Sequence, residues 1–191
     1  MSRMIRQIII AISLLFTTNN ILAQDQEADL IFKDGDTISG FAMITKSDRI
    51  KFRVSQEDKP SKWDFKTVKG IILYGLDDQI ELEYITYNKK QKPVLMEILY
   101  FGKVNLYRRS GSSFFIPSFN EVGGSLKKGG STLYVKREHE EIATNLAGRF
   151  KKKSLEYFKD CPEIVEIFQT KRYLKYSIED VVVEYNTFCD N

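Results

Sequence analysis

The sequence is poor in the residues that most often carry catalysis or bind metals. Its 191 residues include one histidine, His139, and two cysteines, Cys161 and Cys189. The cysteines do not form a C-x-x-C pair, and the histidine is distant from both in sequence, so neither a redox motif nor a zinc site is expected. His139 stands in an acidic predicted turn, where neighbouring side chains point apart, and we expect it to be solvated. No catalytic residue, metal or cofactor is therefore predicted.

Motifs of common enzyme classes are also missing. A hydrolase with a nucleophilic serine elbow needs G-x-S-x-G, and the segment Arg109-Ser110-Gly111-Ser112-Ser113 lacks that pattern. Gly124 and Gly129 have the spacing of the two glycines in a phosphate-binding loop, but Gly130 and Ser131 stand where a lysine and then a serine or threonine are required. These absences favour a non-enzymatic protein.

The amino-terminal apolar segment is too short to cross a membrane. It runs from Ile8 to Phe16, whereas a spanning helix needs about 20 apolar residues. It follows two arginines and precedes small residues near Ala23, which is the order of regions in a secretory signal peptide. We therefore expect residues 1–23 to be removed on export. No cysteine lies near the predicted cleavage site, so no stable membrane anchor is expected afterwards.

Charge of either sign is in little excess. The whole chain has a formal net charge of +3, and the predicted signal peptide contains Arg3 and Arg6 but no acidic residue, so the mature chain would carry +1. A nucleic-acid partner is not expected from so small an excess. Export also changes how the cysteines are interpreted, because an even pair in an oxidising compartment usually forms a bridge. We predict a disulfide between Cys161 and Cys189.

The region from Ala28 to about Leu146 has the two-residue period of β-strands. At 50–54, for example, Ile50, Phe52 and Val54 alternate with basic residues, which is typical of a sheet with one solvated face. Extended segments are expected at 30–32, 37–44, 49–54, 63–68, 70–74, 80–86, 94–101, 104–108, 112–116, 132–136 and 142–146. The pattern leaves open whether these strands form an open antiparallel sheet or a partly closed barrel.

After Gly148 the period becomes helical. Pro162 fits the first position of a helix, and Ser177 with Asp180 forms a capping-box pattern before a second apolar stripe. Strands followed by two or three helices predict an α+β fold. The expected organisation is a signal peptide at 1–23, a β-rich domain at 24–146 and a helical segment at 147–191 packed on that domain.

Basic residues gather around the start of the helical segment and near a glycine-rich stretch at 120–131, which we expect to be a mobile loop. Positive charge at a helix start opposes the helix macrodipole, so its presence there favours a surface that is used for binding. The predicted binding surface consists of Lys127, Lys128, Arg149, Lys151, Lys152 and Lys153. Its expected partner is a macromolecule of the cell envelope, either a protein or a glycan.

Two alternative functions remain open. Glu97 would be a desolvated acid if it shared a buried strand face with Leu95 and Leu99, and it would then suit a glycan-active enzyme with two carboxylates. The many strand aromatics would line a cavity if the strands closed around one, as in a carrier of small ligands.

Three short motifs resemble a set of exported proteins of Gram-negative bacteria that have no assigned activity. The motifs are 34–40, which begins Asp-Gly-Asp-Thr; 97–107, which contains Gly102-Lys103-Val104-Asn105; and 157–163 together with Glu184-Tyr185-Asn186. The resemblance covers most of the mature chain and implies export and a shared fold. It therefore implies a periplasmic or extracellular protein and gives no mechanism.

Overall fold

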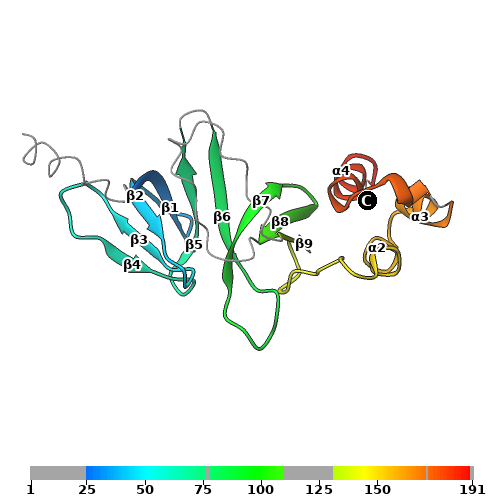
Figure 1. The fold of residues 1–191 in the computed structure, drawn as a ribbon, viewed down its shortest axis with the longest axis horizontal. Helices are drawn as coiled ribbons and strands as arrows, with labels where there is room; N and C mark the ends of the chain where they lie inside the picture. The colour runs from blue at the N-terminus through cyan, green and yellow to red at the C-terminus, as the bar shows by residue number, and fades with distance from the viewer. Residues whose placement is uncertain (1–24, 76–77, 110–130, 171, 190–191) are drawn as a thin grey trace, which may run out of the picture.

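A computed structural model describes residues 25–75, 78–109, 131–170 and 172–189. The predicted signal peptide, the predicted strand at 112–116, Lys127 and Lys128 lie outside these ranges, as does nearly all of the glycine-rich stretch. The described chain is an α+β fold, as predicted, with a nine-stranded antiparallel sheet in the order β4-β3-β2-β1-β5-β6-β7-β8-β9. Figure 1 shows an open sheet, with the helices gathered at the end of the molecule where β8 and β9 lie.

The strands follow one another as hairpins, so each strand pairs mainly with its neighbours in sequence. Their bounds are β1 (Gln26–Phe32), β2 (Thr37–Ile44), β3 (Ile50–Arg53), β4 (Ser61–Trp63), β5 (Val68–Tyr74), β6 (Gln79–Ile85), β7 (Val94–Tyr100), β8 (Val104–Arg109) and β9 (Thr132–Arg137). One exception is the pairing of β1 with β5, which joins the two halves of the sheet.

The helical segment consists of α2 (Phe150–Tyr157), α3 (Pro162–Gln169), the short 3-10 helix η1 (Arg172–Lys175) and α4 (Ile178–Phe188). Pro162 is at the first position of α3, as expected from its missing N–H. Ser177 and Asp180 form the predicted capping box at the start of α4. Among the described helices, none combines the length and apolarity that a bilayer crossing demands.

Two apolar cores form on one face of the sheet. The first is built from β1 to β7 and includes Leu82 and Leu95, while the second joins β8 and β9 to the helices and includes Leu106. Glu97 lies two residues after Leu95 on the same face, and Arg108 lies directly opposite it. The Glu97–Arg108 ion pair therefore lies between the first core, formed by β1 to β7, and the second core, which lies beneath the helices.

The predicted strand at 63–68 is wrong in its second half. β4 ends at Trp63, and the chain then turns at Asp64, whose carboxylate accepts a hydrogen bond from the amide of Lys66. The carbonyl of Asp64 also accepts from the amide of Val68. Aspartate makes such local bonds readily, so this turn replaces the continuous strand that the apolar pattern favoured.

The predicted strand at 142–146 is also wrong. Only an isolated bridge forms there, between Val135 and Thr144. The amide of Ala143 donates instead to the carbonyl of Thr86, which lies beyond the end of β6. This segment therefore crosses from the edge of β9 to the other face of the sheet, where Ala143 joins a third apolar cluster.

Asn186 and Lys103 connect the β7–β8 hairpin with α4, and Nζ of Lys103 donates to the carbonyl of Cys189 at its end. The side chain of Asn186 accepts from the amide of Val104 and donates to its carbonyl, at 2.9 and 2.8 Å. Gly102 lies against the same side chain, and a Cβ at this position would come within 2.7 Å of it. The hairpin can approach the helix this closely because residue 102 has no side chain.

Replacing Gly102 with alanine is expected to lower the free energy of unfolding by about 1–2 kcal/mol, because the new methyl group displaces Asn186 from its two bonds. A urea titration of four proteins tests this: the wild type, Gly102→Ala, Asn186→Ala and the double variant. In the Asn186→Ala background the glycine substitution should cost much less, since no side chain is left to displace. Equal costs in both backgrounds would contradict the steric explanation.

Candidate functional site

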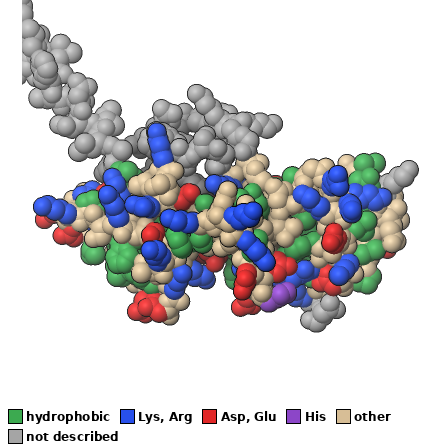
Figure 2. All heavy atoms as spheres, turned by 90° about the horizontal axis from the view of Figure 1, so that it is seen from below, with side chains coloured by type: hydrophobic (Ala, Val, Ile, Leu, Met, Phe, Trp, Pro, Cys, Tyr) green, Lys and Arg blue, Asp and Glu red, His purple; other side chains and the backbone are tan. Residues whose placement is uncertain are grey.

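An open groove with a volume of about 680 Å³ lies between the end of β9 and α2. It is lined by Arg137, His139, Glu140, Thr144, Asn145, Lys153, Glu156, Tyr157, Lys159 and Asp160. His139, the purple side chain in Figure 2, lies at the surface in the turn after β9, near both acidic and basic side chains. The groove therefore presents charged groups of both signs.

Arg137 occupies the centre of this groove and connects three elements. Its Nη2 donates to the carbonyl of Tyr157 at 3.0 Å and to the carboxylate of Asp160 at 2.8 Å. It also donates to the hydroxyl of Tyr185 in α4 at 3.3 Å, and that hydroxyl donates to Asp160 at 2.6 Å. The guanidinium carbon lies 4.5 Å from the ring centroid of Tyr157. Arg137 thus joins β9 to both α2 and α4.

Glu140 completes this arrangement from the turn after β9. One of its carboxylate oxygens accepts from the amide of Arg137 at 2.9 Å and from the hydroxyl of Tyr157 at 2.7 Å. The Arg137 network, as we call it, consists of Arg137, Glu140, Tyr157, Asp160 and Tyr185. Both carboxylates beside Arg137 are therefore used within the protein.

The pKa shifts of Tyr157 and Asp160 hold these two groups in one charge state near neutral pH. Burial and a hydrogen bond to Glu140 raise the pKa of Tyr157 well above its ordinary value. Burial opposes ionisation of Asp160, but hydrogen bonds from Tyr185 and its own backbone, together with the charge of Arg137, outweigh it and lower the pKa of Asp160. A proton-transfer role needs a pKa near the working pH, so the network is suited to holding the helices in place.

The predicted disulfide is present. Cys161 immediately precedes α3 and Cys189 immediately follows α4, and their sulfurs are bonded, with the two Cα atoms 5.5 Å apart. Both residues are buried in the core beneath the helices. A disulfide of this kind fits a protein that matures in an oxidising compartment.

Four residues of the predicted basic surface lie in the described part of the chain. Arg149, Lys151 and Lys152 are exposed around the start of α2. Lys153 instead turns toward the groove, where its Nζ donates to the carbonyls of Asn145 and Ala147 at 2.8 and 2.7 Å. Lys153 therefore fixes the chain that leads into the helix, and a ligand would have to break those bonds to reach it.

One basic residue that sequence reasoning missed belongs to the same surface. Lys159 follows α2, is exposed and lines the groove. The name α2 ridge is used below for Arg149, Lys151, Lys152 and Lys159. A second, shallower hollow of about 470 Å³ lies along this ridge, and Lys151, Lys152, Leu155 and Glu156 line it. Glu156 is the one acidic residue within α2.

Glu97 is held by an arginine. Nε and Nη2 of Arg108 donate to its two carboxylate oxygens at 2.8 and 2.6 Å. Bidentate pairing of this kind stabilises the ionised carboxylate. The residues directly opposite Glu97 in the sheet are Leu82 and Arg108, so the described register places no second acid across from it. The two-carboxylate hypothesis therefore has no facing acid at Glu97.

No protein-family model, curated protein or solved structure matches this chain. The resemblance to exported proteins of Gram-negative bacteria is therefore not tested by these comparisons. Two of the motifs that carry it do meet in space, since Val104 of the 97–107 motif bonds to Asn186. Within the third motif, the hydroxyl of Tyr185 in α4 donates to Asp160, which in turn accepts from Arg137 of β9. These residues join the helices to the sheet, so the motifs contribute to the architecture.

Proposed function

We propose that this protein is an exported, non-enzymatic module that binds an anionic macromolecule of the cell envelope through its α2 ridge. It would act in the periplasm or outside the cell, after removal of residues 1–23. The predicted signal peptide and the disulfide between Cys161 and Cys189 support this location.

One observation carries the proposal. The Arg137 network draws Glu140 and Asp160 onto an internal cation, while four cations of the α2 ridge remain exposed around two hollows. The surface beside α2 is therefore more positive than the composition of this segment suggests. Lysine side chains act as mobile point charges, which suits a flexible polyanion better than a ligand of fixed shape.

The proposal predicts weaker binding to a polyanion when the ridge charges are reversed. In Lys152→Glu/Lys159→Glu, the dissociation constant for dextran sulfate should rise at least about 30-fold, since each lysine near an anionic surface contributes about 1 kcal/mol and each new glutamate repels the polymer. Binding is measured by isothermal titration calorimetry at physiological ionic strength, with uncharged dextran as the reference polymer.

The matched control is Lys33→Glu/Lys69→Glu, which makes the same charge change at two exposed lysines of the sheet. It should bind dextran sulfate within about threefold of the wild type. Equal losses in both double variants would assign the binding to net charge and contradict a role for α2. Failure of the wild type to bind dextran sulfate at all would also contradict the proposal.

A further inference from the structure

A second cluster of polar and aromatic side chains lies at the other end of β8 and β9 from Arg137. Arg109 is the last residue of β8 and pairs in register with Thr132, whereas Arg137 pairs with Val104. The guanidinium carbon of Arg109 lies 4.6 Å from the ring centroid of Tyr87, which follows β6. Stacking on a ring fixes the plane of a guanidinium and leaves its edge available for hydrogen bonds.

The donors of Arg109 are not used within the described parts of the chain, where its guanidinium makes neither a hydrogen bond nor an ion pair of 4 Å or less. This contrasts with its neighbour Arg108, which is engaged by Glu97 on the other face of the sheet. Arg109 is only half-buried, so its donors are within reach of a ligand. An oriented guanidinium with unused donors is a bidentate site for a carboxylate or a phosphate.

Asp48 brings an acceptor to the same place from the β2–β3 turn. Its φ of 53° lies in the left-handed region, which residues other than glycine rarely adopt and which recurs at ligand sites. The hydroxyl of Tyr84 donates to its carbonyl at 2.6 Å and so holds the turn against β6. Burial raises the pKa of Asp48, and the nearby charge of Arg109 partly opposes that rise.

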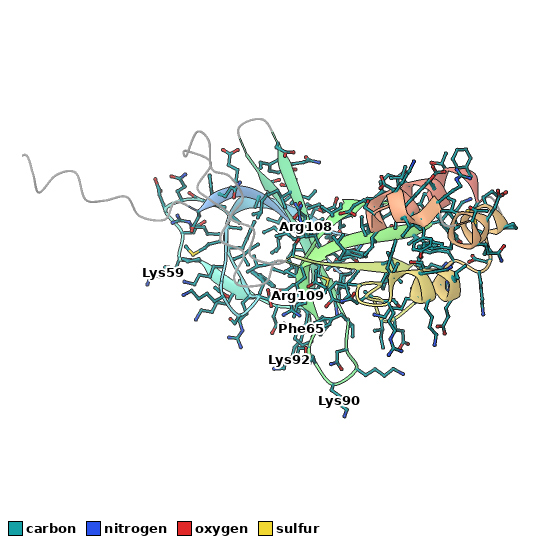
Figure 3. The ribbon with its side chains drawn as sticks, turned by 45° about the vertical axis from the view of Figure 1, so that its right-hand side comes forward. Lys59, Phe65, Lys90, Lys92, Arg108 and Arg109 are labelled. Atoms are coloured by element: carbon teal, nitrogen blue, oxygen red, sulfur yellow. A yellow bond between two sulfur atoms is a disulfide. The ribbon has the colours of Figure 1, made fainter. Side chains whose placement is uncertain are left out.

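Aromatic rings extend the cluster toward the β4–β5 turn. Phe65 packs edge-on against Tyr84, with ring centroids 6.3 Å apart, and is itself partly exposed. Figure 3 shows Arg109 above Phe65 and Lys92 below it, with Lys90 farther along the same loop. Both lysines are exposed. The sheet-end cluster, as we name it, consists of Asp48, Phe65, Tyr84, Tyr87, Lys92 and Arg109. Tyr84 packs against the core of β1 to β7 and Tyr87 against the third apolar cluster, so these residues wrap around the end of the sheet.

This combination of groups distinguishes between classes of ligand. A phosphate or sulfate ion would use the cations but would gain nothing from the rings or from Asp48, which would repel it. A sugar ring packs its C–H groups on aromatic faces, and its hydroxyls donate to a carboxylate. A sugar that also carries a carboxylate would in addition pair with Arg109.

We propose that the sheet-end cluster binds a carboxylated sugar unit, as found in acidic polysaccharides. Arg109 pairs with the sugar carboxylate, Asp48 accepts from ring hydroxyls, and Phe65 packs against the sugar ring. Lys92 adds long-range attraction for neighbouring units of the polymer. This site goes beyond the proposed function and does not depend on the α2 ridge.

The experiment titrates the full mature protein with tetragalacturonate, its methyl ester and tripolyphosphate, using isothermal titration calorimetry. We expect tetragalacturonate to bind at least tenfold more tightly than either of the other two probes. This comparison uses the wild-type protein alone, so it tests the proposal even if a variant fails to fold. Equal binding of tripolyphosphate would identify a general anion site and overturn the proposal, as would equal binding of the methyl ester or no binding of tetragalacturonate.

Variants then locate the site. Arg109→Gln should weaken tetragalacturonate binding about 10- to 100-fold, and Phe65→Ala about 5- to 10-fold, while both retain the circular dichroism spectrum of the wild type. Arg108→Gln is the matched control, because it removes the adjacent arginine, whose donors are already taken by Glu97. Lys152→Glu/Lys159→Glu should keep the tenfold preference for tetragalacturonate over the other two probes, which separates this site from the α2 ridge. Equal weakening by Arg108→Gln, or none by Arg109→Gln, would overturn the assignment.

Discussion

Replacing Arg137 with methionine should lower the free energy of unfolding by about 3 kcal/mol. The side chain of Arg137 is only 17% exposed, and it satisfies Asp160, Tyr185 and the carbonyl of Tyr157 at once. Removing the cation leaves the carbonyl of Tyr157 and the carboxylate of Asp160, whose side chain is 38% exposed, without their guanidinium donor, and the lost hydrogen bonds together cost about this much. Methionine keeps most of the apolar volume, so the loss reports on the hydrogen bonds and the charge. Urea unfolding followed by circular dichroism measures it.

The matched control is Arg108→Met, which breaks a similarly short ion pair whose arginine is 34% exposed. We expect it to cost less, about 1–2 kcal/mol, because the guanidinium of Arg108 bonds to Glu97 alone, whereas that of Arg137 bonds to three residues. A cost for Arg137→Met no larger than that of Arg108→Met would show that the Arg137 network does not hold the helices to the sheet.

The acid dependence of stability provides an independent check. The pKa of Asp160 in the folded protein lies below its ordinary value of 3.8, so its contribution to stability is present above about pH 4 and is lost as the pH falls through the lowered pKa. In Arg137→Met the folded pKa rises toward the unfolded one, so the contribution of Asp160 to this acid loss should shrink. Unfolding curves between pH 7 and pH 2.5 compare the two proteins.

Local patterns in the sequence predict much of this fold, because alternation and capping depend on neighbours along the chain. Ile50 and Phe52 face the core while Lys51 and Arg53 face outward, as the two-residue period indicates. The Ser177–Asp180 capping box is equally local. A helix start or a strand face therefore appears in the sequence before any long-range contact is known.

The Arg137 network could not be predicted in this way. Tyr185 lies 48 residues from Arg137, and Asp160 lies 23 residues away, so no spacing rule connects them. The predicted strand at 142–146 is wrong for a related reason. The backbone of Thr144 bonds to Val135 of β9, whereas the amide of Ala143 bonds to Thr86 beyond β6. Alternation of apolar and polar residues is the same for a segment that crosses between two strands as for a strand of its own, so the sequence could not distinguish them.

The candidate sites show the same division between local and long-range information. Arg149, Lys151 and Lys152 of the charge run at the start of α2 are exposed, but the inward turn of Lys153 depends on carbonyls that only the folded loop presents. The sheet-end cluster was not predicted as a site. Its members come from the β2–β3 turn, the β4–β5 turn, β6 with the loop that follows it, and β8, so nothing in the order of residues unites them.

Removing the disulfide should lower the free energy of unfolding by at least as much as replacing Arg137 does. For Cys161→Ala/Cys189→Ala we expect the free energy of unfolding to fall by about 3–4 kcal/mol. The bridge spans 28 residues, and a loop of that length loses about this much denatured-state entropy when it is closed. Both cysteines are at least 90% buried, and alanine adds a small packing loss to the entropic one.

The test compares urea unfolding of the wild type and the double alanine variant, each with and without dithiothreitol. Reduction should destabilise the wild type by nearly as much as the two substitutions do, and it should leave the variant unchanged. If reduction lowers the free energy of unfolding by less than about 1 kcal/mol, packing alone holds α3 and α4 together.

Because Asn186 precedes Cys189 by three residues, release of the bridge should also loosen the bond from the Val104 amide to Asn186. Faster hydrogen exchange at the Val104 amide, with slow exchange retained in β1 and β5, would place the loss at the carboxyl end of α4.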